Sequence, residues 1–164
     1  MEVLKKGKKV IVMVPEITLT LQILERFQKF FGNRIALLHS GLTARERYRE
    51  WMKVRSGEID IVIGARSAVF APLKDTGLII VDEEHDSAYK QNENPRYNGR
   101  DIAIVRGKLC DAVAILGSAT PSVESFYNCR IGKYEYVSLP ERIDKKPLPT
   151  VEVVNIKGGK IISD

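Results

Sequence analysis

Short, continuously apolar runs alternate with segments of helical periodicity along this chain of 164 residues. The clearest runs are residues 9–14, 59–64 and 78–82, which are rich in valine and isoleucine. Runs of this kind are typical of parallel strands that are covered on both faces. Two further runs, residues 34–38 and 112–117, complete the pattern. The alternation therefore predicts an α/β layered domain with a mostly parallel sheet.

The segments between the predicted strands carry helix signals. Apolar residues at helical spacing predict a helix from about residue 17 to Phe31, with Gly32 placed to end it. Thr43 and Glu46 have the spacing of a capping box, which predicts that a helix starts there. The remaining helices are predicted at residues 100–110 and from Pro121, which suits a first helical turn.

The chain changes character after Leu139, where prolines begin to punctuate it. We predict one domain over residues 1–139 and a connector over residues 140–164. Residues 134–138 are expected to form a last strand of the sheet, and residues 150–156 are expected to form a strand within the connector.

Composition limits the class of protein. The net charge of +5 fits a polyanionic partner but does not establish one. No apolar run approaches the ~20 residues that span a bilayer, and the start does not resemble a signal peptide, so we expect a cytoplasmic protein with no membrane partner. Cys110 and Cys129 lack metal-ligand spacing and are predicted to be buried thiols.

The sharpest local signal is an acidic box, in which Asp82, Glu83, Glu84 and His85 directly follow an apolar run. Open parallel sheets bind ligands at the carboxyl ends of their strands. An aspartate there can hold Mg²⁺ through water, and a neighbouring glutamate can orient the water that attacks a terminal phosphate. Two other interpretations of the acidic box stay open at this point. It could be an acidic loop that caps the next helix, or part of a metal-dependent hydrolase with His85 as a direct ligand.

A second signal, the small residues from Gly117 to Thr120, follows another predicted strand. The hydroxyl groups of Ser118 and Thr120 could hydrogen-bond a nearby side chain such as His85 and report the state of a bound nucleotide. Either residue could also cap the helix that begins near Pro121, and the two roles are compatible.

The acidic box at residues 82–85 and the Gly-Ser-Ala-Thr segment at residues 117–120 resemble motifs II and III of superfamily 2 helicases. The surrounding sequence is similar to bacterial primosomal helicases of the PriA kind. The blocks that carry this second resemblance are residues 14–20, 39–42, 64–72 and 82–91. Two departures are Ala65, where a threonine is expected, and Asn98-Gly99, where His-Ala is usual.

This resemblance implies a three-layer RecA-like fold of the P-loop NTPase type and an ATP-driven DNA helicase acting in replication restart. Asp82 would hold Mg²⁺ through water, Glu83 would activate water, and His85 would couple the nucleotide site to Ser118 and Thr120. Tyrosine rings of an aromatic-rich loop would stack on bases, and its cations would meet phosphates. The residues implied at the DNA track are Pro15, Glu16, Arg66, Ser67, Tyr89, Lys90, Arg96, Tyr97 and Arg100.

No Gly-x-x-x-x-Gly-Lys-Ser/Thr loop occurs in the sequence, although such loops cradle nucleotide phosphates. We therefore expect a fragment: residues 1–139 would be a first motor domain that is incomplete at its N-terminus, and the connector would lead to a second motor domain. ATP and Mg²⁺ would serve the full-length protein, zinc would bind only outside this segment, and the fragment alone would be inactive.

The partners that the resemblance implies are single-stranded or forked DNA, primosome proteins and single-strand-binding protein. Sheet edges left unpaired in a fragment would favour self-association. The basic run from Arg45 to Arg55 is interpreted as a solvated helix face, because glutamates alternate with the cations.

Two other functions fit the sequence. A non-catalytic DNA-binding or regulatory module would keep the fold without binding ATP, but it would have no chemical need for Asp82 and Glu83. A metal-dependent hydrolase would use Asp82, Glu83 and His85, with His39 as a further ligand.

Overall fold

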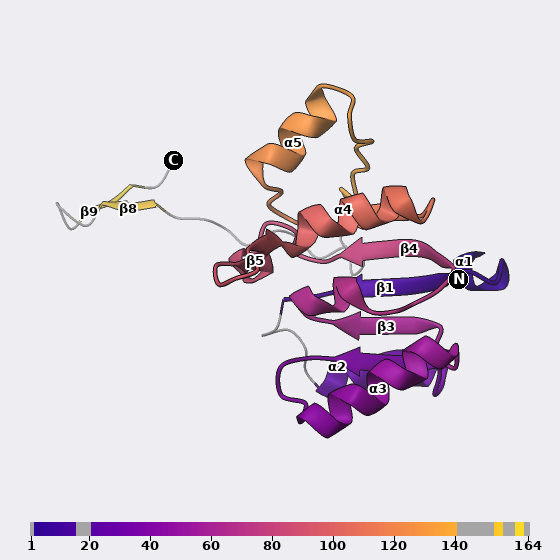
Figure 1. Ribbon diagram of the computed structural model, residues 1–164. Helices are drawn as coiled ribbons and strands as arrows, with labels where there is room; N and C mark the ends of the chain where they lie inside the picture. The colour runs from indigo at the N-terminus through magenta and orange to yellow at the C-terminus, as the bar shows by residue number, and fades with distance from the viewer. Residues whose placement is uncertain (1, 16–20, 141–152, 156–159, 163–164) are drawn as a thin grey trace. The chain divides into compact units, whose positions relative to one another are not determined.

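The computed structural model describes residues 2–15, 21–140, 153–155 and 160–162. The chain divides into two units, residues 1–127 and 128–164. The first unit holds a sheet with helices on both faces (Figure 1). The second holds the end of helix α5 (Val123–Arg130) and an antiparallel pair of strands, β8 (Val153–Asn155) and β9 (Lys160–Ile162).

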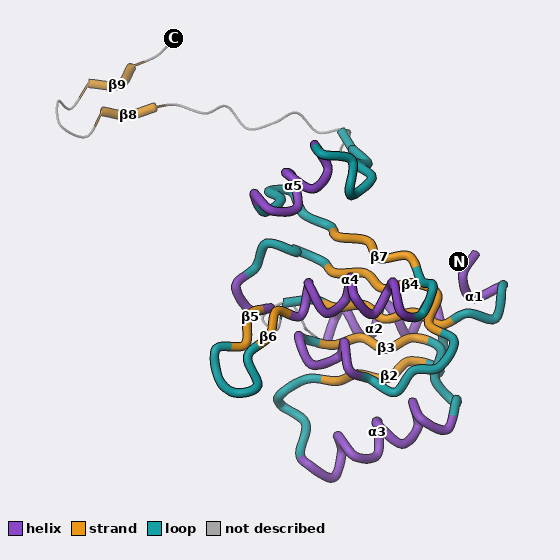
Figure 2. The backbone as a smooth tube through the Cα atoms, turned by 45° about the horizontal axis from the view of Figure 1, so that its top comes forward, coloured by secondary structure: helices purple, strands orange, loops and turns teal. Residues whose placement is uncertain are grey.

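Five parallel strands form the sheet in the order β2-β3-β1-β4-β7 (Figure 2). Val12 of the central strand lies opposite Ile63 on one side and Ile80 on the other. Each of the five strands overlaps a predicted apolar run, although β4 starts two residues earlier than expected, and the mostly parallel sheet is confirmed. The strands are β1 (Lys9–Met13), β2 (Ile35–Leu38), β3 (Ile61–Gly64), β4 (Thr76–Val81) and β7 (Val113–Leu116).

Each face of the sheet has its own hydrophobic core, because side chains alternate across a strand. On one face, Ile11 and Ile79 pack with Val54 of α3 and Ala103 of α4. On the other face, the strands pack against apolar side chains of α1 and α2. The helices are α1 (Glu2–Lys5), α2 (Leu21–Phe31), α3 (Ala44–Ser56) and α4 (Gly99–Leu109). The result is the predicted three-layer α/β arrangement.

Short elements complete the first unit. They are the 3-10 helices η2 (Arg66–Phe70) and η3 (Ser87–Tyr89), and the antiparallel strands β5 (Lys90–Gln91) and β6 (Tyr97–Asn98). Within the described part of the chain, no helix combines the length and the apolar character that crossing a membrane requires.

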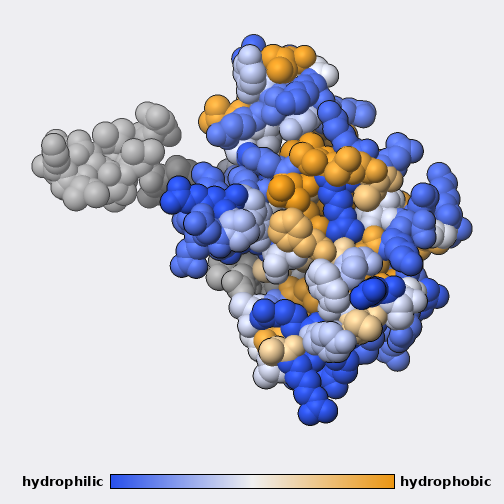
Figure 3. Space-filling model, in the orientation of Figure 1, coloured by the Kyte–Doolittle hydropathy of each residue, from blue (hydrophilic) through white to orange (hydrophobic). Residues whose placement is uncertain are grey.

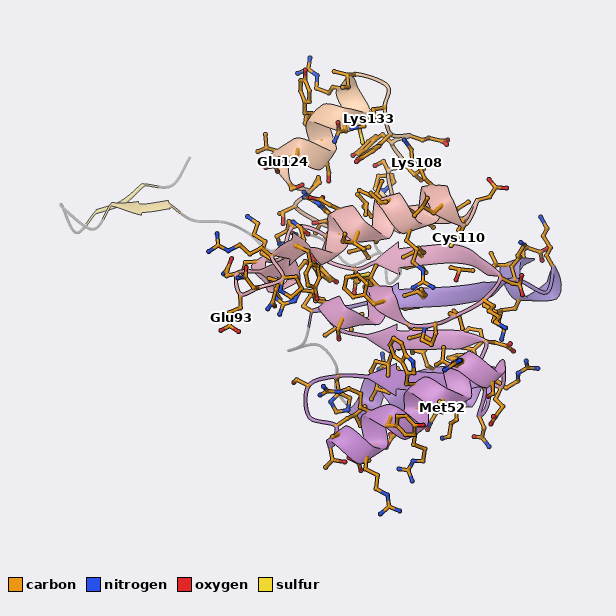
Figure 4. The ribbon with its side chains drawn as sticks, in the orientation of Figure 1. Met52, Glu93, Lys108, Cys110, Glu124 and Lys133 are labelled. Carbon is orange, nitrogen blue, oxygen red and sulfur yellow. The ribbon has the colours of Figure 1, made fainter. Side chains whose placement is uncertain are left out.

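Several local predictions were wrong. Residues 134–138 form no strand, and Tyr136 and Val137 are exposed, so the apolar character of this run does not reflect burial in a sheet. Cys110 and Cys129 are only half-buried; Cys110 ends α4, where a helix terminus meets solvent (Figure 4). Pro121 precedes α5 rather than lying in its first turn.

Other local predictions agree with the structure or fall outside it. Gly32 ends α2 with a φ of 69°, a conformation that glycine adopts without a steric cost. Strand β8 lies inside the predicted strand at residues 150–156. The predicted start of α2, at residues 17–20, lies outside the described residues.

Helix α3 starts with the predicted capping box. The Thr43 hydroxyl oxygen accepts a hydrogen bond from the Glu46 N–H at 3.3 Å, and the Glu46 carboxylate accepts one from the Thr43 N–H at 2.9 Å. Lys53 and Glu50, within the run of alternating charges on this helix, form an ion pair at 2.8 Å. The surface over α3 is mainly hydrophilic (Figure 3), which supports its interpretation as a solvated face.

Removing the cap should weaken this helix. We expect Thr43→Ala to lower the free energy of unfolding in urea by about 1 kcal/mol, whereas Ser56→Ala, at the exposed end of α3, should change it by less than about 0.5 kcal/mol. Hydrogen bonds from Thr43 lower the pKa of Glu46. The stabilisation from that carboxylate is therefore present above its ordinary pKa and lost as the pH falls through the lowered value. Equal stability of the two variants at neutral pH would contradict the prediction.

Candidate functional site

The acidic box and the small-residue segment meet at the carboxyl ends of two paired strands. Val81 of β4 lies opposite Leu116 of β7, so the residues that follow leave the sheet side by side. The Gly117 N–H donates to the Val81 carbonyl oxygen at 2.8 Å, which continues the pairing beyond the strand. A Cβ atom at Gly117 would lie 3.8 Å from the Asp82 carboxylate oxygen. The sheet register therefore places the Asp82 side chain beside the start of the loop.

Glu83 turns the chain sharply away from β4. Its φ is 46°, in the left-handed region, which costs a residue with a Cβ atom roughly 1 kcal/mol. The Asp82 carboxylate accepts a hydrogen bond from the Glu83 N–H at 3.1 Å and supports the turn. Asp82 is exposed and Glu83 is half-exposed. Both carboxylates can therefore reach a ligand in solvent, and backbone strain of this kind is often kept at functional sites.

His85 meets the small-residue loop as the sequence predicts. Its Nδ1 atom lies 2.8 Å from the Ser118 hydroxyl oxygen and 3.6 Å from a Glu83 carboxylate oxygen. The Ser118 hydroxyl oxygen also accepts a hydrogen bond from the Thr120 N–H at 2.9 Å. Thr120 is exposed and holds the loop through its backbone. The structure thus brings together His85, Glu83 and Ser118.

Neither Ser118 nor Thr120 caps α5, contrary to that alternative. Ser122 does so: its hydroxyl oxygen accepts a hydrogen bond from the Ser125 N–H at 3.2 Å, three residues on. Helix α5 therefore begins at Val123, two residues after Pro121, and Ser118 is left available for His85.

Sequence analysis missed the central role of Glu84, which is only 3% exposed. Its carboxylate accepts hydrogen bonds from the Ser122 N–H at 2.6 Å, the Ser122 hydroxyl at 3.0 Å, the Ser125 hydroxyl at 2.9 Å and Arg100 Nη1 at 3.1 Å. Burial alone would raise the pKa of Glu84, but these hydrogen bonds together lower it. The sequence does contain a signal for this role: two serines, Ser122 and Ser125, lie three residues apart near the predicted helix start and can both donate to one carboxylate.

Arg100 was expected to offer charge to DNA phosphates, but in the structure its guanidinium is paired within the protein. Its side chain is 13% exposed and binds Glu84 at 3.1 Å and Asp101 at 2.9 Å. Burial works to lower the pKa of Arg100, but hydrogen bonds to Asp101 and Glu84 raise it overall. The guanidinium is already paired inside the protein, so it supports the fold instead of presenting a free charge.

Tyr89 was expected to stack on bases, but it is 1% exposed. Its hydroxyl donates a hydrogen bond to the Asp82 carbonyl oxygen at 2.6 Å. Burial, followed by the negative charges of Asp82, Asp86 and Glu83, raises the pKa of Tyr89 well above its ordinary value. Tyr89 is therefore a buried, neutral side chain that hydrogen-bonds to the backbone of the acidic box.

Five of the predicted DNA-track residues line one hollow of about 600 Å³: Pro15, Arg66, Ser67, Tyr89 and Tyr97. Other lining residues, which sequence analysis did not assign to DNA, include His39, Ser40, Arg47 and Phe70. The hollow thus combines cations, hydroxyl groups and aromatic rings within one concave surface.

Arg66 organises one wall of this hollow. Its guanidinium donates hydrogen bonds to the carbonyl oxygens of Ala88, at 3.2 Å, and Lys90. It also lies 5.8 Å from the centre of the Tyr97 ring, within the range of a cation–π contact. The Tyr97 ring meets Phe70 edge-on at 5.1 Å between ring centres. Phe70 is 48% exposed and so offers an aromatic surface.

Two further predicted DNA residues, Lys90 and Arg96, lie on the β5–β6 hairpin. Lys90 and Arg96 are exposed, and Arg96 donates a hydrogen bond to the Asn92 carbonyl oxygen at 3.1 Å. Glu93 lies at the outer tip of the hairpin (Figure 4). Glu16 lies outside the described residues.

The acidic box suits Mg²⁺ held through water better than a dedicated metal cage. Asp82 presents an exposed carboxylate at a strand end, as water-mediated binding requires. Among the residues that the structure describes, no three histidine, cysteine, aspartate or glutamate side chains gather closely enough to hold an ion. The direct ligand set that the hydrolase alternative requires, with Asp82, Glu83, His85 and His39, is therefore not assembled there.

Comparison with known proteins identifies the class. A sequence model of the DEAD/DEAH box helicase family matches residues 1–128, and the chain belongs to that family. Within it, the chain is 47% identical over 156 residues to the replication restart protein PriA of Bacillus subtilis (strain 168). It is 45% identical over 160 residues to PriA of Haemophilus influenzae (strain ATCC 51907). The resemblance to PriA helicases is confirmed.

These matches cover 95% and 98% of this chain but only 19% and 22% of the two relatives. The chain thus spans about a fifth of the length of the curated relatives that it matches. Among solved structures, the helicase domain of Hef from Pyrococcus furiosus matches 82% of this chain and 29% of its own, with a TM-score of 0.54 and 20% identity. RecG bound to a three-way DNA junction matches 77% of this chain and 16% of its own, with a TM-score of 0.50 and 26% identity. These likenesses confirm the RecA-like fold.

The buried ion pair gives a stability prediction. Arg100→Met would leave the Glu84 carboxylate buried without its cation, and we expect the free energy of unfolding to fall by about 3 kcal/mol. Arg96→Met, on the exposed hairpin, is the matched control and should change it by less than about 0.5 kcal/mol. Urea titration at neutral pH measures both. If the two variants were equally stable, Arg100 would not be the structural residue that its contacts indicate.

Proposed function

We propose that the intact gene product containing this segment is an ATP-dependent DNA helicase of the PriA kind that acts in replication restart. One observation carries the proposal: Asp82 and Glu83 leave β4 beside the loop after β7, while His85 lies 2.8 Å from Ser118 of that loop. A carboxylate pair and a hydrogen-bonded sensor at neighbouring strand ends suit phosphoryl transfer.

The residues have distinct proposed roles. Asp82 would hold Mg²⁺ through water, and the bound metal ion would neutralise charge on the nucleotide phosphates. Glu83, adjacent in the chain and half-exposed, would orient the attacking water. His85 and Ser118 would report the occupancy of the site to the β7–α5 loop, and Thr120 would hold the loop through its N–H.

The hollow bounded by Arg66, Phe70 and Tyr97 is the proposed track for single-stranded DNA. Aromatic rings stack on bases of any sequence, and nearby cations attract the phosphates. Arg47, Ser67 and the more distant cations of the hairpin would contribute to the same path. Primosome proteins and single-strand-binding protein are proposed partners, and the cytoplasm is the proposed location, on the family resemblance alone.

A non-catalytic module remains the second candidate, and ATP turnover distinguishes the two. The intact gene product should hydrolyse ATP faster when single-stranded DNA is added. Asp82→Ala and Glu83→Gln should each lower kcat by roughly a hundredfold or more, because each removes a group that acts on the reacting phosphate or water. Glu58→Gln, an exposed glutamate after α3, is the control and should turn over normally.

DNA-stimulated hydrolysis that survived Asp82→Ala would contradict these roles. DNA binding without any ATP hydrolysis would favour the non-catalytic module.

The hollow predicts a selective effect on DNA binding. Phe70→Ala should weaken binding of an oligothymidine to the intact gene product by roughly tenfold, the effect of losing one stacked base. Phe126→Ala is a matched control, because Phe126 is 49% exposed and Phe70 is 48% exposed, but Phe126 lies on α5. Fluorescence anisotropy measures the affinity of both. Equal losses would place the single strand elsewhere.

A further inference from the structure

The loop between β7 and α5, which carries Ser118, is held at both ends by a single residue. The Glu84 N–H donates a hydrogen bond to the Gly117 carbonyl oxygen at 3.0 Å, where the loop begins. The Glu84 carboxylate accepts hydrogen bonds from the Ser122 N–H at 2.6 Å and the Ser122 hydroxyl at 3.0 Å, where the loop ends. Glu84 also directly precedes His85, the partner of Ser118. One residue thus joins the two sides of the His85–Ser118 contact.

The position of this carboxylate is itself fixed from two helices. The Ser125 hydroxyl of α5 donates to it at 2.9 Å, and Arg100 of α4 donates at 3.1 Å. Its side chain is 1% exposed, so water does not compete for these oxygen atoms. A buried carboxylate whose donors come from several elements holds those elements in one arrangement, because each unmade hydrogen bond would leave a charge unsatisfied.

We propose that Glu84 is a positioning residue that keeps Ser118 within hydrogen-bonding distance of His85 by fixing both ends of the loop. Its carboxylate is turned into the protein, so it acts through the loop and not on a substrate. A purely structural role, in which Glu84 only anchors α5, predicts lower stability with an unchanged His85 environment. The consequence for ATP hydrolysis rests on the proposed function, but the effect on His85 does not.

The histidine rings provide the test, because the chain contains only two histidines. The His39 Nδ1 atom accepts a hydrogen bond from the Gly41 N–H at 3.1 Å, in a contact that does not involve Glu84, so His39 is an internal control. Side-chain ¹⁵N NMR of the 164-residue chain, at one pH at which the rings are neutral, reports the tautomer and hydrogen bonding of each ring.

Ser118→Ala removes the partner of His85 directly and defines the signal of the broken contact. We expect Glu84→Gln to move the His85 ¹⁵N signals most of the way to the Ser118→Ala positions, with His39 unchanged. Asp101→Asn is the matched control: it removes the other carboxylate that binds Arg100, at 2.9 Å, but does not touch the loop, and should leave both histidines unchanged.

The proposal is overturned if Glu84→Gln retains the wild-type His85 signals while Ser118→Ala moves them. If Glu84→Gln does not fold, as loss of the His39 signals would show, Ser125→Ala replaces it. That variant removes one hydrogen bond to the carboxylate. We expect it to shift the His85 signals in the same direction by a smaller amount, and unshifted signals would again overturn the proposal.

A second measurement separates this proposal from the proposed function. In the intact gene product, Glu84→Gln should lower kcat for DNA-stimulated ATP hydrolysis roughly ten- to a hundredfold, the usual range for residues that orient others, with KM for ATP within about twofold. An unchanged kcat would overturn the catalytic part. If the wild-type product hydrolysed no ATP, the proposed function would fail, and the NMR result would still decide whether Glu84 positions Ser118.

Discussion

The parallel pairing of β4 between β1 and β7 is the constraint on which the rest of the site depends. Parallel strands in register end at the same edge, so Met13, Val81 and Leu116 finish together. The Asp82 N–H donates to the Met13 carbonyl oxygen, and the Gly117 N–H donates to the Val81 carbonyl oxygen. These bonds carry the alignment one residue past each strand. The acidic box and the loop after β7 therefore lie side by side because the strands that precede them are paired in register.

The burial of one charged pair then fixes the positions of the surrounding helices. Removing Glu84 and Arg100 from water costs free energy, and serine donors offset this cost because they satisfy the remaining carboxylate lone pairs. Those donors come from the start of α5, and the guanidinium comes from the start of α4. The ends of both helices are thereby tied to the segment that follows β4, and their positions near the candidate site are a consequence of one satisfied carboxylate.

Sequence analysis predicted the sheet and the capping box from periodicity and spacing. It offered the His85–Ser118 contact because both residues follow predicted strands, and the helicase resemblance implied the same pairing. It could not predict which polar residues face inward. Tyr89 and Arg100 belong to a segment with the composition of a DNA-binding loop, yet Tyr89 is buried and bonded to Asp82, and Arg100 is half-buried and paired with Glu84. Glu84 looked like one acid among three, since burial depends on tertiary packing. Phe70 was overlooked because its exposure is decided by the fold of η2 against the hairpin.

Tyr89 links the two parts of the candidate site, which are the acidic box and the hollow. The residue helps to line the hollow with Arg66 and Tyr97, and its hydroxyl donates a 2.6 Å hydrogen bond to the Asp82 carbonyl oxygen. Arg66 in turn donates to the carbonyl oxygens of Ala88 and Lys90 on either side of Tyr89. A buried hydrogen bond of this kind is costly to leave unmade. A displacement of Arg66 or of the hairpin therefore cannot move Tyr89 without also disturbing the backbone of the acidic box.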